Sequence, residues 1–375
     1  MKIHTWLPDI FEFKGGIQVY SRFLVQALET ALPDAHIHVF LKNDARITNK
    51  LEFNQRTKFQ FAGRWKSSWL HTPVFAFQVF LAAVQKRPDL IICGHINFSP
   101  LALLICKFLK IPYWTVAHGV EAWNIDNPTL QRALHNADRI LAVSEYTGDR
   151  LIKEQNLDPQ KISILHNTFD ADQFQPAPKP TYLLHRHQLK PEQPIILTVA
   201  RLSASEQYKG YDQIIRAMPK IRSMIPDVHY MIVGKGDDKS RIKQLITELK
   251  LENCVTLAGF VPDAELCDYY NLCHLFAMPS KGEGFGIVYL EALACGKPVL
   301  GGNQDAAIDA LCHGKLGALV NPDDVLEIAH TIIEILLGKY NNSLMYQPQS
   351  LRQAVIDTFG FEQFQKTLAG YLHRL

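Results

Sequence analysis

Short runs of apolar residues recur along the chain, and segments with helical spacing of apolar positions follow most of them. After an opening strand within residues 3–14, the pattern predicts strands at residues 37–41, 90–93, 113–117, 140–143 and 162–165. In the second half it predicts strands at residues 195–199, 229–233, 255–257, 275–278 and 298–300. Strands that alternate with helices indicate right-handed βαβ units, hence an α/β fold with parallel sheets. Ligands of such sheets bind beyond the carboxyl ends of strands, so functional residues are expected just after them.

The length of 375 residues exceeds what one hydrophobic core usually fills, which favours two domains. Prolines at positions 176, 178 and 180 favour an extended linker between them. We therefore expect an N-terminal domain at residues 1–170, a linker at 171–194 and a second domain at 195–355. An amphipathic pattern predicts a C-terminal helix within residues 356–375.

Composition indicates a packed globular protein, with 47% hydrophobic and 20% charged residues. The net charge of +2 is too small to favour nucleic acid as a partner. Residues 41–70 are locally basic, with seven Lys and Arg residues against two acids, and Phe61, Trp65 and Trp69 lie among them. This mixture fits peripheral contact with an anionic membrane or a lipid-phosphate acceptor, and equally a solvated loop with a few core aromatics.

The seven cysteines are odd in number and form no CxxC pair, which is typical of reduced thiols in a cytoplasmic protein. The N-terminus shows no signal-peptide pattern, and no apolar run approaches the roughly 20 residues that a membrane span needs. We therefore expect a cytoplasmic protein, with any membrane contact at the inner face and peripheral.

The most informative segment surrounds residues 281–298. The apolar run 275–278 predicts a strand, the glycine-rich loop after it carries Glu283, and the following helix carries Glu291. Backbone N–H groups at such a helix start bind phosphate, whereas the two carboxylates suit hydroxyl groups. Together these groups suit a sugar attached to a nucleotide diphosphate.

The motif EGFGIVYLE at residues 283–291, followed by ALACGKPV, resembles the E-x7-E motif of the retaining glycosyltransferases with the GT-B fold (glycosyltransferase family 4, glycosyl transferases group 1). The resemblance implies two Rossmann-like domains that face each other across a cleft, and a last helix that crosses back to the N-terminal domain. It also implies that Glu283 contacts the donor sugar and Glu291 the ribose. The residues implied to surround the distal phosphate are Gly284, Phe285, Gly286, Ile287 and Val288.

Arg201 and Lys209 follow the predicted strand 195–199, and the family pairs an arginine and a lysine here to neutralise the diphosphate leaving group. The loop between them is longer than the spacing typical of the family. Further along, the resemblance implies that Gly234 and Gly236 flank the nucleotide, and that Phe260 and Val261 lie against the base.

Gly15 and Gly16 lie between the opening strand and a predicted helix, where glycines let a diphosphate approach the backbone. His118 ends the predicted strand 113–117, and the family places a histidine here near the donor sugar. Glu121 is expected either to meet the acceptor or to orient this loop. Ser144 is expected to cap the next helix, and Asn167 to line the cleft.

The resemblance implies a hexosyltransferase that uses a UDP- or GDP-sugar and a saccharide or lipid-linked acceptor, without cofactor or metal. Asp170 and Asp172 form an Asp-x-Asp sequence, but they lie in the expected linker, so no metal site is predicted there. Two alternatives stay open: a nucleotide-sugar epimerase on the same fold, and a non-catalytic nucleotide-sugar-binding module. A dinucleotide dehydrogenase is disfavoured because no Gly-x-Gly-x-x-Gly follows the first strand.

Overall fold

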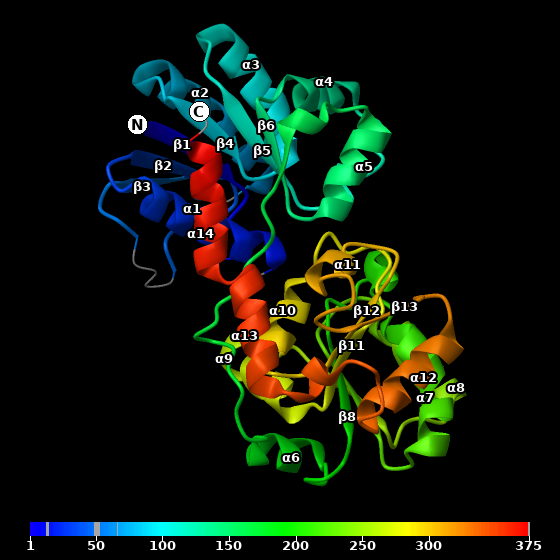
Figure 1. Cartoon of the computed structure of the whole chain (residues 1–375). Helices are drawn as coiled ribbons and strands as arrows, with labels where there is room; N and C mark the ends of the chain where they lie inside the picture. Colours follow the sequence, from blue (N-terminus) through cyan, green and yellow to red (C-terminus); the bar gives the residue numbers. More distant parts are fainter. Residues whose placement is uncertain (13–14, 49–52, 66, 374–375) are drawn as a thin grey trace. The chain divides into compact units, whose positions relative to one another are not determined.

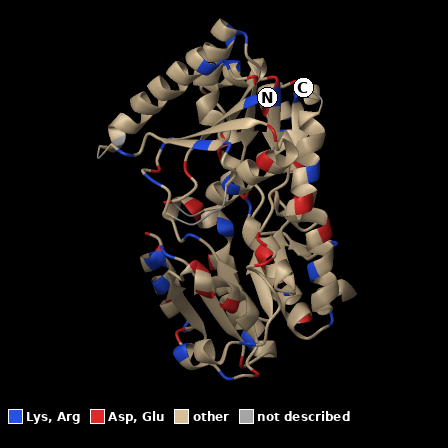
Figure 2. Ribbon diagram, turned by 90° about the vertical axis from the view of Figure 1, so that its left-hand side faces the viewer, with Lys and Arg blue, Asp and Glu red and all other residues tan. Residues whose placement is uncertain are grey.

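The computed structural model describes residues 1–12, 15–48, 53–65 and 67–373, which form two compact units (Figure 1). Unit 1 comprises Met1–Thr168 together with Phe361–Leu375, and unit 2 comprises Phe169–Gly360. Each unit has its own parallel sheet and its own buried core. Basic and acidic residues are scattered over both units (Figure 2), in keeping with the small net charge.

Unit 1 is built on a seven-stranded parallel sheet with the strand order β3-β2-β1-β4-β5-β6-β7. The strand order reverses between β1 and β4. The strands are β1 (Lys2–Leu7), β2 (His36–Leu41), β3 (Thr57–Phe61), β4 (Leu90–Cys93), β5 (Tyr113–Ala117), β6 (Arg139–Ala142) and β7 (Ile162–Ile164).

Helices of unit 1 cover the sheet. They are α1 (Gly16–Ala31), α2 (His71–Lys86), α3 (Ser99–Leu109), α4 (Pro128–Asn136), α5 (Glu145–Gln155) and α14 (Phe361–Leu372). Short 3-10 turns lie at η1 (Ser68–Leu70), η2 (Ile96–Phe98), η3 (Val120–Ala122) and η4 (Pro159–Lys161). Apolar residues of α2, α3 and α4 pack with Trp6 and Phe40 of the sheet in one buried core.

Unit 2 has a six-stranded parallel sheet with the order β10-β9-β8-β11-β12-β13, which reverses between β8 and β11. The strands are β8 (Ile195–Val199), β9 (His229–Val233), β10 (Val255–Gly259), β11 (Leu275–Met278), β12 (Val299–Gly302) and β13 (Ala318–Val320). The helices are α6 (Thr181–His187), α7 (Tyr211–Met224), α8 (Lys239–Glu248), α9 (Asp263–Leu272), α10 (Ile287–Ala294), α11 (Ala307–Ala310), α12 (Val325–Leu336) and α13 (Pro348–Phe359), with 3-10 turns η5 (Ala204–Lys209) and η6 (Ser343–Tyr346).

The C-terminal segment, expected as one helix within residues 356–375, consists of α13 in unit 2 and α14 in unit 1. Gly360 separates the two helices with φ −61° and ψ 161°, and a Cβ here would lie 2.4 Å from the carbonyl oxygen of Ile356. Helix α14 lies alongside α1 (Figure 1), where the Phe364 ring meets the Tyr20 ring edge-on at 5.5 Å. The last helix thus belongs to the N-terminal unit, as the resemblance implied.

Three elements were not foreseen in the sequence: the strands β3 and β13, and the helix α6 inside the expected linker 171–194. Strand β3 lies at the sheet edge and only Phe61 in it is buried, so its apolar pattern is weak. Helix α6 has only seven residues, of which Leu183 and Leu184 are buried, and it follows a proline-rich stretch. Its helical pattern was therefore too short to be recognised.

The seven cysteines are all free, and five of them are buried. Within the part of the chain that the structure describes, no helix is long and apolar enough to cross a membrane. Of the locally basic segment 41–70, Lys50, Glu52 and Lys66 lie outside the described residues.

Candidate functional site

The loops at the switch point of unit 2 carry the residues for which the sequence predicts chemistry. Strands β8 and β11 lie side by side where the strand order reverses. Arg201 follows β8 and Glu283 follows β11. In doubly wound sheets this is the position where ligands bind, beyond the carboxyl ends of the strands.

These two loops pack closely on each other. The backbone N–H of Lys281 donates a hydrogen bond to the carbonyl of Tyr208 at 2.9 Å. A Cβ on Gly282 would lie 2.8 Å from the Tyr208 ring, and a Cβ on Gly210 would lie 2.1 Å from the carbonyl oxygen of Pro279. Gly210 also has φ +74°, which favours glycine. Glycine at these points lets the two loops touch.

Contact between the loops joins Lys209 to Glu283. The Lys209 ammonium forms an ion pair with the Glu283 carboxylate, and the two side chains are 14% and 13% exposed. Burial acts to lower the pKa of Lys209, but Glu283, Tyr208 and Glu206 raise the pKa more, so Lys209 is firmly protonated. Both residues were predicted from the sequence, and the structure brings them together.

Glu206 is a member of this cluster that the sequence analysis missed. It pairs with Arg201 at 2.7 Å and with Lys209 at 3.7 Å. The longer spacing between Arg201 and Lys209 was the available signal, because the extra residues fold into η5 and place this acid between the two cations. The Arg201 side chain is 73% exposed, so one of the two cations faces solvent.

Asp305 is a second residue that was missed, and it fixes the backbone of Glu283. Its carboxylate accepts hydrogen bonds from the N–H of Glu283 at 2.7 Å and of Ala307 at 2.9 Å. Burial raises the pKa of Asp305 to about 6, although these hydrogen bonds oppose the shift. Its position in the loop after the predicted strand 298–300 was the only signal in the sequence.

Helix α10 begins directly after the glycine-rich loop. Gly286 precedes it with φ +87°, and a Cβ there would lie 2.5 Å from the Tyr289 ring. No side chain caps this helix start, so the N–H groups of Ile287 and Val288 point away from the helix body without a capping oxygen. The Phe285 ring is buried against Phe359 at 5.4 Å, which leaves its backbone as the part that a ligand would meet.

Glu291 lies in the second turn of α10 and is partly buried. The Tyr270 hydroxyl, which was not predicted, donates a hydrogen bond to Glu291 Oε2 at 2.7 Å. Burial raises the pKa of Glu291 to about 7. The carboxylate is therefore held in one orientation and titrates close to neutral pH.

Glycines of the loop after β9 serve protein packing. A Cβ on Gly234 would lie 1.8 Å from the carbonyl oxygen of Ala200, and a Cβ on Gly236 would lie 1.9 Å from that of Leu202. The N–H of Leu202 also bonds the carbonyl of Lys235 at 3.0 Å. This loop therefore supports the backbone on both sides of Arg201, and its contact with a nucleotide stays a prediction.

Phe260 and Val261 differ in exposure. Val261 is buried, whereas the Phe260 ring is 63% exposed and has the Lys235 ammonium 4.8 Å from its centroid. Phe260 and Lys235 therefore offer an exposed aromatic face and a cation on the loops after β9 and β10.

Unit 1 carries the remaining predicted residues at the carboxyl ends of its strands. Gly15 and Gly16 are exposed, and Gly16 begins α1 without a side-chain cap. The buried Asp44 carboxylate accepts hydrogen bonds from three consecutive N–H groups, at residues 10–12, with distances of 2.6, 3.0 and 2.9 Å. Asp44 thereby shapes the loop that leads toward the glycine pair.

His118 has a fixed orientation within unit 1. Its Nε2 lies 2.8 Å from the carbonyl oxygen of Gly94, and since a carbonyl only accepts, Nε2 carries the proton. Burial lowers the pKa of His118 to about 4, so the ring is neutral and Nδ1 is an acceptor. Glu121 accepts the His118 N–H at 2.6 Å, which favours its loop-orienting role, and Ser144 caps α5 as predicted.

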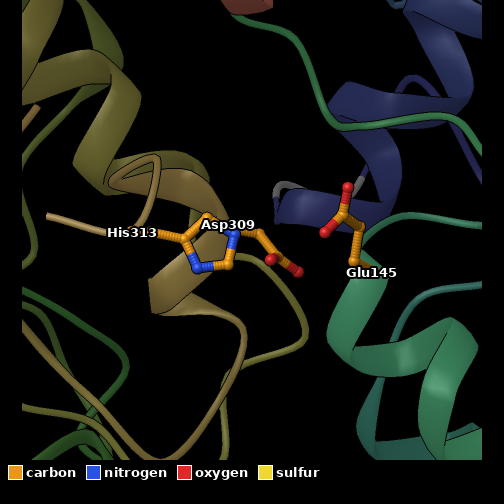
Figure 3. Close-up of side chains that lie close together, drawn as sticks. All are labelled: Glu145, Asp309 and His313. Atoms are coloured by element: carbon orange, nitrogen blue, oxygen red, sulfur yellow. The ribbon is translucent and has the colours of Figure 1, made fainter. Parts of the chain in front are cut away.

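Two residues of unit 2 place metal-ligating atoms close together. Figure 3 shows Asp309 of α11 and His313 after it close together, and this pair offers two ligands, fewer than protein metal sites usually have. Glu145, labelled in the same figure, belongs to α5 of unit 1. The Asp170 carboxylate accepts N–H groups of Asp172 and Gln173, at 3.2 and 3.1 Å, as a turn-capping residue does.

Comparison with known families covers both units. Residues 14–173 match the family described as Glycosyltransferase Family 4, and residues 183–350 match the family described as Glycosyl transferases group 1. Together the two matches extend over most of the chain.

Among characterised relatives, a GDP-mannose-dependent alpha-(1-6)-phosphatidylinositol monomannoside mannosyltransferase of Mycolicibacterium smegmatis is 30% identical over 230 residues. That alignment covers 58% of this chain and 59% of the relative. A GDP-mannose-dependent monoacylated alpha-(1-6)-phosphatidylinositol monomannoside mannosyltransferase of Corynebacterium glutamicum is 26% identical over 339 residues, 86% of this chain and 85% of the relative.

Among solved structures, that of Anabaena HepE in complex with UDP and glucose superimposes with a TM-score of 0.79 at 21% identity and covers all of both chains. At this identity the match shows the fold. With two doubly wound parallel sheets of seven and six strands, the fold is GT-B, as predicted.

The position of Glu206 leads to a first prediction. Glu206→Gln removes a carboxylate that competes for Arg201 and Lys209, so the affinity of unit 2 for pyrophosphate should rise. If the ion pairs with Glu206 contribute about 1 kcal/mol, their loss should raise the affinity for pyrophosphate roughly threefold to tenfold. Calorimetry measures this change. Glu252→Gln, at an exposed acid with no contact to these cations, is the control and should leave the affinity unchanged. A weaker binding by Glu206→Gln would show that this acid supports the cations instead of occupying them.

A second prediction concerns pH. Because the pKa of Glu291 is raised to about 7 in the folded protein, the folded state binds a proton more tightly than the unfolded state does. Stability from this group is therefore present at low pH and lost as pH rises from about 4.5 through about 7. Relative to Glu291→Gln, the wild type should lose about 1–3 kcal/mol of unfolding free energy between pH 5 and pH 8. Urea denaturation of both proteins at the two pH values measures this, and parallel pH profiles would contradict it.

Proposed function

We propose that this chain, which matches Glycosyltransferase Family 4 over residues 14–173 and Glycosyl transferases group 1 over residues 183–350, transfers a hexose from a nucleotide diphosphate sugar to an acceptor hydroxyl. The observation that carries this proposal is the cluster of Arg201, Lys209 and Glu283 at the switch point of unit 2. Two cations beside an uncapped helix start suit the diphosphate of a donor. Carboxylates within the same loop and helix suit the hydroxyls of its sugar and ribose.

For the donor we favour a guanosine diphosphate sugar. Both characterised relatives named above are GDP-mannose-dependent, while the structure of HepE contains UDP and glucose. The acceptor we propose is a saccharide or a lipid-linked hydroxyl, as the phosphatidylinositol mannosides of those relatives suggest. The chain spans about 59% of the length of the first of them.

The proposed mechanism retains the anomeric configuration. The bond between C1 of the sugar and the phosphate oxygen breaks, and the acceptor oxygen forms the new bond to C1 on the same face. The acceptor proton passes to the departing diphosphate. Arg201, Lys209 and the N–H groups at the start of α10 stabilise the charge that develops on the leaving oxygens, which is usually the largest catalytic term.

The other predicted residues receive orienting roles. Glu283 holds sugar hydroxyls, and Glu291 holds the ribose hydroxyls. The face of Phe260 suits the nucleobase. We propose that no metal is needed, since basic side chains and a helix start can replace a cation at a diphosphate.

Transfer is favoured over the two alternatives by this set of groups. An epimerase would convert the donor without an acceptor, and a binding module would bind the donor without turnover. Release of the nucleotide diphosphate that depends on added acceptor distinguishes transfer from both.

Substitution of the charged cluster tests the proposed function. Glu283→Ala and Arg201→Ala should each lower turnover at least 100-fold, since loss of one stabilising group costs about 3–4 kcal/mol at the transition state. The fold should survive, as measured by circular dichroism and thermal melting. Matched controls are Glu252→Ala and Arg216→Ala, at exposed positions of unit 2, which should keep normal turnover. Near-normal turnover of either cluster variant would contradict the assignment.

We also propose that unit 1 contacts an anionic membrane surface. In the basic segment, Trp65 and Trp69 are 54% and 75% exposed. Helices α2 and α3 pack together and extend this apolar surface with Phe77, Phe80, Leu104 and Phe108, which are all exposed. Exposed aromatics beside basic residues are typical of proteins that bind the lipid interface.

Vesicle binding tests the membrane proposal. Trp69→Ser combined with Phe108→Ser should lower binding to vesicles that contain phosphatidylglycerol at least tenfold, because both side chains are mostly exposed in the protein and would be buried in the interface. Leu326→Ser combined with Met224→Ser, at exposed apolar residues of unit 2, is the matched control. Equal loss in both double variants, or none in the first, would contradict it.

A further inference from the structure

Unit 1 contains a basic pocket at the amino ends of its first strands, at the edge of the sheet opposite to the loops of His118 and the glycine pair. The pocket has a volume of about 310 Å³. Its lining residues come from β1, β2, β3 with the residue before it, and the end of α2: Lys2, His4, His36, Ile37, His38, Arg56, Lys58, Gln85 and Lys86.

Strand register brings these side chains to one face of the sheet. Lys2 pairs with His36, His4 pairs with His38, and His38 pairs in turn with Lys58 on β3. Side chains two residues apart on a strand share a face of the sheet. The basic residues of β1 and β2 therefore lie on the same face as Trp6 and Phe40, which belong to the core. The apolar row is covered by α2, and the basic row begins where that helix ends.

Positive charge in the pocket is poorly compensated. None of its lining residues, all of which lie in the described part of the chain, is acidic. Arg56 pairs with the exposed Asp34 at 2.7 Å, and Asp89 accepts the backbone N–H of Lys2 at 2.7 Å. The ammonium groups of Lys58 and Lys86 have no carboxylate partner among the described residues.

Two buried histidine nitrogens also lack a partner. His4 is 2% exposed, and His4 Nδ1 and His38 Nδ1 form no hydrogen bond within the described structure. Their rings meet edge-on at 5.5 Å. Burial and the charge of Lys86 lower the pKa of His4 to about 3 and of His38 to about 4, so both rings are neutral without a ligand. Buried polar groups are normally hydrogen-bonded, so two such exceptions at one pocket indicate a missing partner.

We propose that this pocket binds a small anion that carries phosphate groups, at a site separate from the donor site of unit 2. Four cationic side chains and the imidazole rings offer more donors than a single carboxylate can accept, whereas a phosphate or diphosphate has enough oxygens. The volume lies within the range of small-ligand pockets, roughly 300–1,000 Å³. Phosphate groups of this kind occur both in soluble metabolites and in lipid headgroups.

The test uses inorganic phosphate and pyrophosphate on the full chain, with a readout from the two histidines of this pocket. Both anions should shift the imidazole NMR signals of His4 and His38, assigned with the variants His4→Gln and His38→Gln. Lys58→Ala combined with Lys86→Ala should weaken this binding at least tenfold. Lys239→Ala combined with Lys243→Ala removes two exposed charges from α8 and should leave it unchanged.

Vesicles that contain phosphatidic acid distinguish the two sources of phosphate. Binding of the soluble anions supports a metabolite, and signal changes with the vesicles alone support a headgroup. The inference is overturned if neither probe moves the two histidine signals, or if both lysine double variants weaken binding equally. Because the readout comes from His4 and His38, it is independent of transferase activity.

Discussion

Direct contact between the loop after β8 and the loop after β11 is the constraint on which the candidate site depends. Two glycines permit it: Gly210 against the carbonyl of Pro279, and Gly282 against the ring of Tyr208. A Cβ would lie 2.1 Å from the opposite loop at Gly210 and 2.8 Å from it at Gly282, so a larger residue would push the loops apart. The Lys209–Glu283 ion pair would then lose its geometry, because each partner is anchored in a different loop.

The ion pairs that result are balanced in charge. Two cations, Arg201 and Lys209, face two carboxylates, Glu206 and Glu283, within one partly buried cluster. A buried charge without a partner is costly, so this balance keeps both cations in place. Under the proposed function, a diphosphate would bring further negative charge and compete with these carboxylates for the two cations. Glu206 suits that competition better than Glu283, since the Glu206 N–H bonds only a carbonyl of its own 3-10 turn, whereas the buried Asp305 carboxylate holds the N–H of Glu283.

Much of this arrangement could be predicted from the sequence, because its signals are local. Buried parallel strands appear as short apolar runs, and ten of the thirteen strands could be located in that way in addition to the opening one. Glu283 and Lys209 were identified from motifs at strand ends. Glu206 and Asp305 could not be, since an acid in a loop has no pattern of its own and its role depends on which loops meet in space. Strand β3 was not predicted, because an edge strand with one buried residue has no apolar run.

Histidines lie at both ends of the strands in the unit 1 sheet, and their hydrogen-bond partners distinguish their roles better than the residue type does. His118 is neutral, and its Nε2 proton is engaged by the carbonyl of Gly94, so its orientation is explained within the fold. His4 and His38 are neutral as well, yet each keeps a nitrogen without a partner. An unsatisfied buried polar atom costs about 1–3 kcal/mol. Two such atoms beside four cations lower the stability of the free protein, and an anion would relieve both the missing hydrogen bonds and the repulsion at once.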